Sequence, residues 1–131
     1  MTLANTCLLV AGLLPIFCAG IAKWGTFGKP RREGGYDNHD PRAWLSRQEG
    51  FRLRANHAQS NSFEALPLFV AGVLVAQQAS APQGTVDLLA AGFVALRMAY
   101  IAAYVTDRAT LRTGLWTLAL AVNIGLFAVA W

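Results

Sequence analysis

The chain has 131 residues, of which 55% are hydrophobic and 14% are charged, and its formal net charge is +4. Soluble globular domains are about 45–50% apolar and about 25% charged, so this composition favours a single-domain membrane protein. It excludes a disordered chain, a collagen and a disulfide-stapled secreted scaffold. No nucleic-acid partner is expected, because most of the 11 basic residues lie between Lys23 and Arg54, mixed with acidic residues and flanked by apolar segments.

The first apolar segment runs from Leu3 to Ala22 without a charged residue. At about 1.5 Å per residue, a helix of this length spans about 30 Å, which is the thickness of a bilayer core. No basic residue precedes the segment and Lys23 follows it, the reverse of a secretory signal peptide. We therefore expect a retained membrane helix, in which Cys7 and Cys18 pack as small apolar residues.

A polar loop of about residues 24–45 follows and carries much of the basic charge. Asp40 and Pro41 are typical of a helix start, with Asp as the N-cap and Pro at the first helical position. We expect a short amphipathic helix here, lying at the membrane surface. His39 lies close to two carboxylates in this loop, where a solvated turn is favoured over a metal site. No metal is expected anywhere in the chain.

Four long helices are expected, and the fold class is all-α. Because the later connections are short, the helices predict an integral membrane four-helix bundle with antiparallel, up-down topology. The first and third loops carry Lys and Arg, whereas the second carries none. The positive-inside rule then places the first and third loops in the cytoplasm and both termini outside. The expected helices cover about residues 3–23, 46–79, 85–106 and 110–131 of a single domain, 1–131.

Ionisable residues at membrane depth are the most informative side chains, because each costs on the order of 2.5–3.5 kcal/mol on insertion scales. At helical spacing, such residues and their polar neighbours form one stripe on each of the last three helices. The stripes consist of Arg54, His57, Asn61 and Glu64; of Arg97, Tyr100, Tyr104 and Arg108; and of Arg112, Trp116 and Asn123.

Glu64 and Arg97 are expected at similar depths, about 10 Å and about 13 Å from their helix ends. We predict that they form a buried ion pair that holds the second and third long helices together. A structural role for this pair is favoured over a catalytic role. The other polar groups gather at the cytoplasmic end and suit a small anionic ligand. The alternative is that Arg54, Arg108 and Arg112 extend to the headgroup layer.

These residues carry a resemblance to a known family. The segment Arg54–Pro67 resembles the second-helix signature of the MAPEG family, membrane-associated proteins in eicosanoid and glutathione metabolism, in which an Arg-Ala stretch leads to Asn-x-x-Glu and a proline. The segment Arg97–Tyr104, followed by Leu111 and Arg112, is similar to the family's third helix and connecting loop. The pattern looks more like a bacterial branch than like the leukotriene or prostaglandin synthases.

The resemblance implies a homotrimer in a bacterial inner membrane, in contact with lipid, with glutathione as co-substrate and a small lipophilic substrate. Arg112 matches the arginine that activates the glutathione thiol, because a nearby cation stabilises the nucleophilic thiolate. Arg112 is thus the expected catalytic residue. The expected ligand-binding residues are Arg54, His57, Asn61, Glu64, Arg97, Tyr100, Tyr104 and Arg108.

The leading functional prediction is a membrane glutathione-dependent transferase or peroxidase acting on lipophilic electrophiles. The alternative is a non-enzymatic protein of the same fold that binds another small anion or a lipid. It is favoured by His57 and Ser60, which stand where glutathione-using members have arginines that bind the carboxylates of the tripeptide. A small multidrug exporter with one membrane carboxylate is disfavoured, because Glu64 has an expected partner in Arg97.

Overall fold

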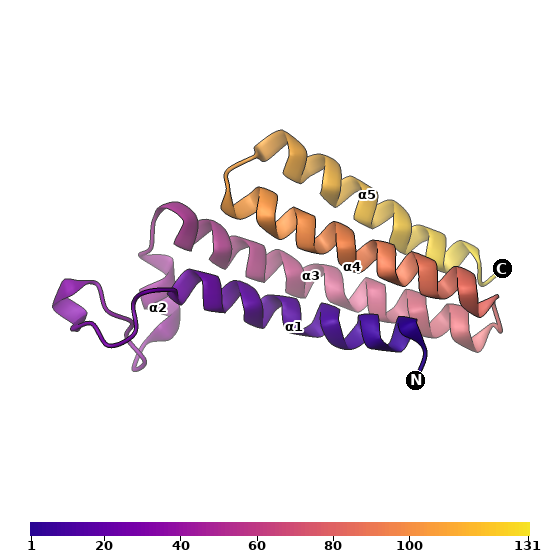
Figure 1. Cartoon of the computed structure of the whole chain (residues 1–131), viewed down its shortest axis with the longest axis horizontal. Helices are drawn as coiled ribbons and strands as arrows, with labels where there is room; N and C mark the ends of the chain where they lie inside the picture. The colour runs from indigo at the N-terminus through magenta and orange to yellow at the C-terminus, as the bar shows by residue number, and fades with distance from the viewer.

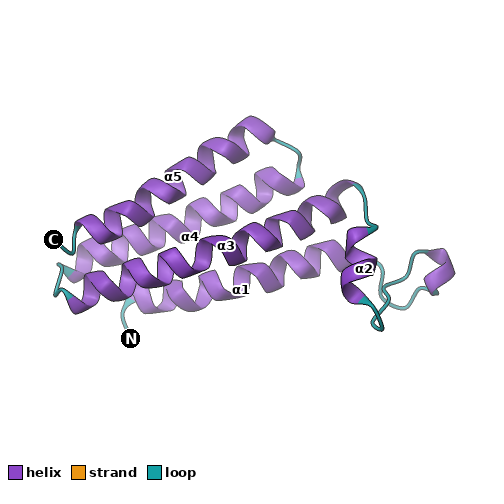
Figure 2. Cartoon of the chain, turned by 180° about the vertical axis from the view of Figure 1, so that it is seen from behind, coloured by secondary structure: helices purple, strands orange, loops and turns teal.

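The computed structural model describes residues 1–131, and all of its regular structure is helical. Four long helices lie side by side in alternating directions, so both termini lie at one end (Figure 1). The first loop projects from the opposite end and contains a 3₁₀ turn and the short helix α2 (Figure 2). The helices are α1 (Leu3–Lys23), α2 (Pro41–Ser46), α3 (Gly50–Gln78), α4 (Gln83–Val105) and α5 (Ala109–Ala128), and the 3₁₀ turn is Arg31–Glu33.

Three of the long helices, α1, α4 and α5, are long and apolar enough to cross a membrane, with 21, 23 and 20 residues. The helix α3 is not among them, because its first half carries charged residues from Arg52 to Glu64. Its 29 residues measure about 43 Å, which exceeds the roughly 30 Å of a hydrocarbon core. The polar first turns of α3 therefore have room to lie outside the lipid.

The chain turns between α2 and α3, where the sequence predicted one helix from about residue 46. The helix α2 ends at Ser46, and α3 begins at Gly50 with a φ of 59°. Glycine adopts this left-handed backbone conformation without a steric penalty, which allows the change of direction. The short helix predicted from Asp40 is confirmed, since the Asp40 carboxylate accepts the Ala43 backbone N–H at 3.2 Å.

Small and aromatic residues fill the space between the helices. Phe69 of α3 and Phe93 of α4 stack with their ring centroids 4.0 Å apart. Cys7 and Cys18 are free and buried among apolar side chains, as the sequence predicted. A Cβ added to Gly72 of α3 would lie 3.1 Å from the Cβ of a leucine in α5, so glycine permits close approach of these helices, as is common in membrane bundles.

Polar contacts join three helices at the end of the bundle that holds the termini. The Asp87 carboxylate of α4 accepts the Ala4 backbone N–H of α1 at 2.8 Å and so caps the start of a neighbouring helix. Gln77 of α3 donates to the Thr2 hydroxyl at 3.2 Å and to the Asn5 side-chain carbonyl at 3.1 Å. These contacts fix the relative heights of α1, α3 and α4, and with them the positions of the polar stripes on α3 and α4.

Candidate functional site

A buried arginine, Arg97 of α4, lies between the polar residues of α3 and the tyrosines of its own helix. Arg97 is 2% exposed to solvent. Its Nη2 donates to the Asn61 Oδ1 at 2.9 Å and to the Ser62 Oγ at 3.3 Å, both on α3. Its guanidinium carbon lies 4.1 Å from the ring centroid of Tyr100. These contacts compensate the cost of removing a charged group from water.

The predicted ion pair between Glu64 and Arg97 is wrong. The one ion pair in the chain joins Arg31 and Asp37 of the first loop, at 3.3 Å. Glu64 is exposed, and its carboxylate accepts the side-chain amide of Asn61 at 3.3 Å. Asn61 therefore bridges the two charged side chains, because the rotation of α3 turns Asn61, rather than Glu64, towards the buried guanidinium.

These residues line a cavity of about 190 Å³ between α3, α4 and α5. Its polar lining includes Asn61 and Glu64 from α3, Arg97 from α4 and Asn123 from α5, whereas most of the remaining lining is apolar. Asn123 is 3% exposed, and its Oδ1 has no hydrogen-bond donor within the chain. A buried carbonyl left unpaired costs about 1–3 kcal/mol. The cavity therefore offers a buried acceptor to any group that donates a hydrogen bond.

A second group of the predicted residues surrounds Tyr104 of α4. The Tyr104 ring lies 5.6 Å from that of Tyr100 and 6.3 Å from that of His57, centroid to centroid. The guanidinium carbon of Arg112 lies 4.5 Å from the Tyr104 ring centroid. Arg54 donates from Nε to the last backbone carbonyl of α4 at 3.0 Å. The structure thus brings these side chains of α3, α4 and α5 to one end of the bundle.

Two arginines and two tyrosines form a continuous row through both groups. Arg97 contacts Tyr100, Tyr100 contacts Tyr104, and Tyr104 contacts Arg112. Arg97 is buried, whereas Arg112 is partly exposed. A partly exposed guanidinium beside a phenol can meet an anion from water and stabilise it by charge and hydrogen bonding.

Arg108 makes fewer polar contacts than its place among the predicted ligand-binding residues suggested, and Ser60 also lies outside the site. Arg108 is exposed, and its side chain makes no hydrogen bond and no ion pair. Ser60, which stands where glutathione-using members have an arginine, is exposed and donates to the Asn56 carbonyl of its own helix at 3.4 Å. Among the arginines at this end of the bundle, Arg112 is the one whose guanidinium packs on the Tyr104 ring.

Sequence reasoning did not include Ser62, Trp116 and Asn123 among the site residues. Ser62 follows the predicted site residue Asn61 in the chain, and its hydroxyl also donates to the Ala58 carbonyl of its own helix at 2.8 Å. A serine within a helix commonly makes such a bond, so its presence in the sequence did not indicate a contact with Arg97. Trp116 and Asn123 line the cavity. Their signal was available, since they share one face of the last helix with Arg112 and an amide within a membrane helix marks a functional position.

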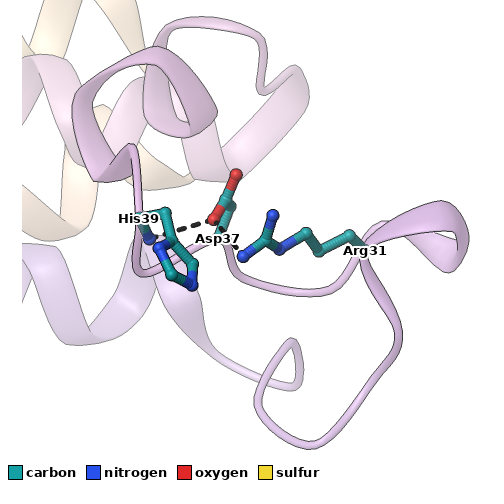
Figure 3. A network of polar contacts seen from close by, with 3 residues as sticks. All are labelled: Arg31, Asp37 and His39. Atoms are coloured by element: carbon teal, nitrogen blue, oxygen red, sulfur yellow. Dashed lines mark hydrogen bonds and ion pairs between the residues drawn. The ribbon is translucent and has the colours of Figure 1, made fainter.

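The first loop contains the histidine that could have suggested a metal. The backbone N–H of His39, and not its ring, donates to the Asp37 carboxylate at 3.0 Å, and the same carboxylate pairs with Arg31 (Figure 3). Nowhere in the chain do three or more His, Cys, Asp or Glu side chains gather as metal ligands do. This cluster therefore shapes a turn.

Comparison with known proteins gives one match. The model of the MAPEG family matches residues 3–131. No curated protein and no solved structure matches the chain. The matched range includes all four long helices, and with them the cavity and the residues around Tyr104.

Proposed function

The chain belongs to the MAPEG family, membrane proteins of eicosanoid and glutathione metabolism, and from this premise we propose that it is a glutathione-dependent transferase or peroxidase acting on lipophilic electrophiles. The observation that carries the proposal is the row of contacts from Arg97 through Tyr100 and Tyr104 to Arg112. It supports a site in which a partly exposed cation and tyrosine side chains receive an anionic, thiol-bearing ligand.

In the proposed reaction, Arg112 stabilises the glutathione thiolate, since a guanidinium beside a thiol favours the deprotonated form. The thiol proton leaves to water, which reaches Arg112 because this side chain is partly exposed. The thiolate attacks the electrophilic carbon of the substrate, a C–S bond forms, and the leaving group departs with its bonding electrons. Asn61, Tyr104 and Arg54 orient the tripeptide by hydrogen bonds and charge.

The peroxidase form of the proposal uses the same thiolate on a lipophilic hydroperoxide. The thiolate attacks the terminal oxygen, the O–O bond breaks, and the alcohol leaves after taking up a proton. A second glutathione then displaces water from the sulfenic acid and gives the disulfide. The largely apolar lining of the cavity between α3, α4 and α5 supports a substrate that arrives from the bilayer.

The proposal extends to assembly and topology. We propose that all four long helices cross the membrane, that the chain forms a homotrimer, and that it resides in a bacterial inner membrane with its first and third loops in the cytoplasm. The common end of the two termini supports the antiparallel arrangement (Figure 1). The basic residues of the first loop support its cytoplasmic position.

Conjugation kinetics test the proposal. Purified protein in detergent is given glutathione and chlorodinitrobenzene, and we expect a rate that saturates with glutathione. Arg112→Gln lowers kcat by at least about tenfold, because one stabilising group of the thiolate is lost. Arg47→Gln, which changes an exposed cation of the first loop, leaves the rate unchanged. A wild-type protein without conjugating or peroxidase activity, or an Arg112 variant with full activity, contradicts the proposal.

The exposed position of Ser60 favours a second candidate function. Ser60 and His57 stand where glutathione-using members have arginines, so two guanidiniums are missing here. Ser60 bonds to its own helix and His57 is exposed. The second candidate is a non-enzymatic family member that binds another small anion or a lipid. His57→Arg distinguishes the two: it tightens glutathione binding if the site is built for the tripeptide, and it has no effect on glutathione if the second candidate is correct.

A further inference from the structure

The beginning of the first loop exposes two aromatic side chains at the end of α1. Trp24 is 76% exposed and Phe27 is 67% exposed. Together with Phe17 and Ile21 of α1, they line an apolar hollow of about 770 Å³. The hollow continues the exposed apolar surface of a helix suited to cross a membrane. Aromatic residues at the end of such a helix are typical of the layer between acyl chains and headgroups.

The loop that carries these aromatics is held by contacts within itself and with α3. The ring of Tyr36 packs edge-on against Phe27 and against Trp44 of α2, with centroid distances of 5.6 Å and 5.2 Å. Arg52 of α3 donates to the Trp24 backbone carbonyl at 2.6 Å. These contacts hold the backbone at Trp24 and the ring of Phe27 in place at the end of α1.

Unpaired cations follow directly after the aromatics. Lys29 and Arg32 are exposed, and neither side chain makes a hydrogen bond or an ion pair. The nearby Asp37 carboxylate is already occupied by Arg31 and by a backbone N–H (Figure 3). Since Lys29 comes two residues after Phe27, their Cα atoms are within about 7 Å. Cationic groups therefore stand just beyond the aromatic pair.

The longer segment that contains these residues also has a net positive charge. Between Lys23 and Arg54 the chain has eight basic and four acidic residues, which accounts for the entire formal charge of +4. Within the segment, Asp37 is paired with Arg31, and Asp40 caps α2. Arg52 and Arg54 donate to backbone carbonyls. The exposed carboxylates of Glu33 and Glu49 then stand against the four exposed cations Lys29, Arg32, Arg42 and Arg47. The segment thus presents an excess of free positive charge next to a membrane helix.

We propose that Trp24, Phe27, Lys29 and Arg32, together called the loop-one surface, dock onto an anionic phospholipid bilayer. The two aromatics lie in the interfacial layer, and the two cations meet lipid phosphates. The negative potential of such a bilayer attracts basic residues beside a membrane span. Charge complementarity and continuity with the apolar face of α1 favour lipid over a second copy of the chain. This inference does not rest on the proposed glutathione chemistry.

Reconstitution of the full chain into nanodiscs of phosphatidylcholine, with and without phosphatidylglycerol, tests the proposal. The thermal midpoint of unfolding is measured for the wild type and for two double variants with the same change in charge. The test variant is Lys29→Gln/Arg32→Gln. The control is Arg42→Gln/Arg47→Gln, since Arg42 lines a separate hollow between α2 and α3.

We expect phosphatidylglycerol to raise the midpoint of the wild type and of the control, and the test variant to lose at least half of that rise. The rise also falls as salt is added, because surface charges are screened. An equal loss in both double variants, or no rise in the wild type, overturns the proposal. Inorganic phosphate that reproduces the rise in phosphatidylcholine nanodiscs also overturns it, since the surface would then bind a soluble anion.

Lipid retention provides a second measurement that does not depend on midpoints. Protein extracted from mixed nanodiscs into mild detergent is analysed by mass spectrometry for the phospholipids that remain bound. We expect phosphatidylglycerol to be enriched on the wild type and depleted on Trp24→Ala/Phe27→Ala, provided that circular dichroism shows the same helical content. Equal retention by this variant and the wild type contradicts the role of the aromatic pair.

Discussion

Replacing Asn61 tests how the buried guanidinium is held between α3 and α4. Asn61→Ala removes the acceptor that lies 2.9 Å from the Arg97 Nη2. Hydrogen bonds to charged groups contribute about 1.5–3 kcal/mol, and the remaining acceptor, Ser62, lies at the longer distance of 3.3 Å. The exposed bond from Asn61 to Glu64 adds little. We therefore expect Asn61→Ala to lower the free energy of unfolding by about 1.5–3 kcal/mol.

The comparison with Glu64→Gln makes this prediction refutable. Glutamine keeps an acceptor oxygen for the Asn61 amide, and Glu64 is exposed, so its loss of charge should cost less than about 1 kcal/mol. Both variants are unfolded in mixed detergent micelles and followed by far-ultraviolet circular dichroism. A loss in Glu64→Gln that equals or exceeds that of Asn61→Ala would refute the reasoning. It would show that the carboxylate pairs directly with Arg97.

Three further predictions concern residues outside this pair. Asn123→Leu raises the free energy of unfolding by about 1–3 kcal/mol, because it removes a buried carbonyl without a donor; a fall in thermal midpoint would contradict this. Gly35→Ala opens the first loop to protease, since its Cβ would overlap the Lys29 carbonyl oxygen. Gly12→Ala, with no atom within 4 Å, is the control, and equal digestion of the two variants would oppose the prediction. Asp87→Ala lowers the free energy of unfolding by about 1 kcal/mol, whereas Asp87→Asn keeps an acceptor and loses less; equal losses would refute a capping role.

The helices were predictable because their signal is local. A helix in lipid must satisfy its own backbone, so a long apolar segment such as Leu3–Ala22 has few alternatives. The capping residues Asp40 and Pro41 likewise predicted α2 from adjacent positions. The start of α3 was less predictable, because the turn before it depends on the backbone conformation of Gly50, and polar residues continue on both sides.

The sequence predicted which helix faces carry the residues of the candidate site, but not which of these residues contact each other. Helical spacing placed Asn61 and Glu64 on one stripe, yet residues three apart point about 60° from each other. Which of them meets Arg97 therefore depends on the rotation of α3 about its axis, and packing against three neighbouring helices sets that rotation. The same limit applies to Asn123, whose face was visible in the sequence but whose burial depends on how α5 packs against α3 and α4.

The central claim is that the chain binds reduced glutathione at the residues around Tyr104 and Arg112. The most direct measurement is the thermal midpoint of the detergent-purified protein as reduced glutathione is added, beside an S-alkylated analogue. The account predicts a rise with both ligands that grows with the logarithm of ligand concentration above the Kd and corresponds to about 2.7 kcal/mol at about 100 times the Kd. A midpoint that neither ligand moves would contradict the claim.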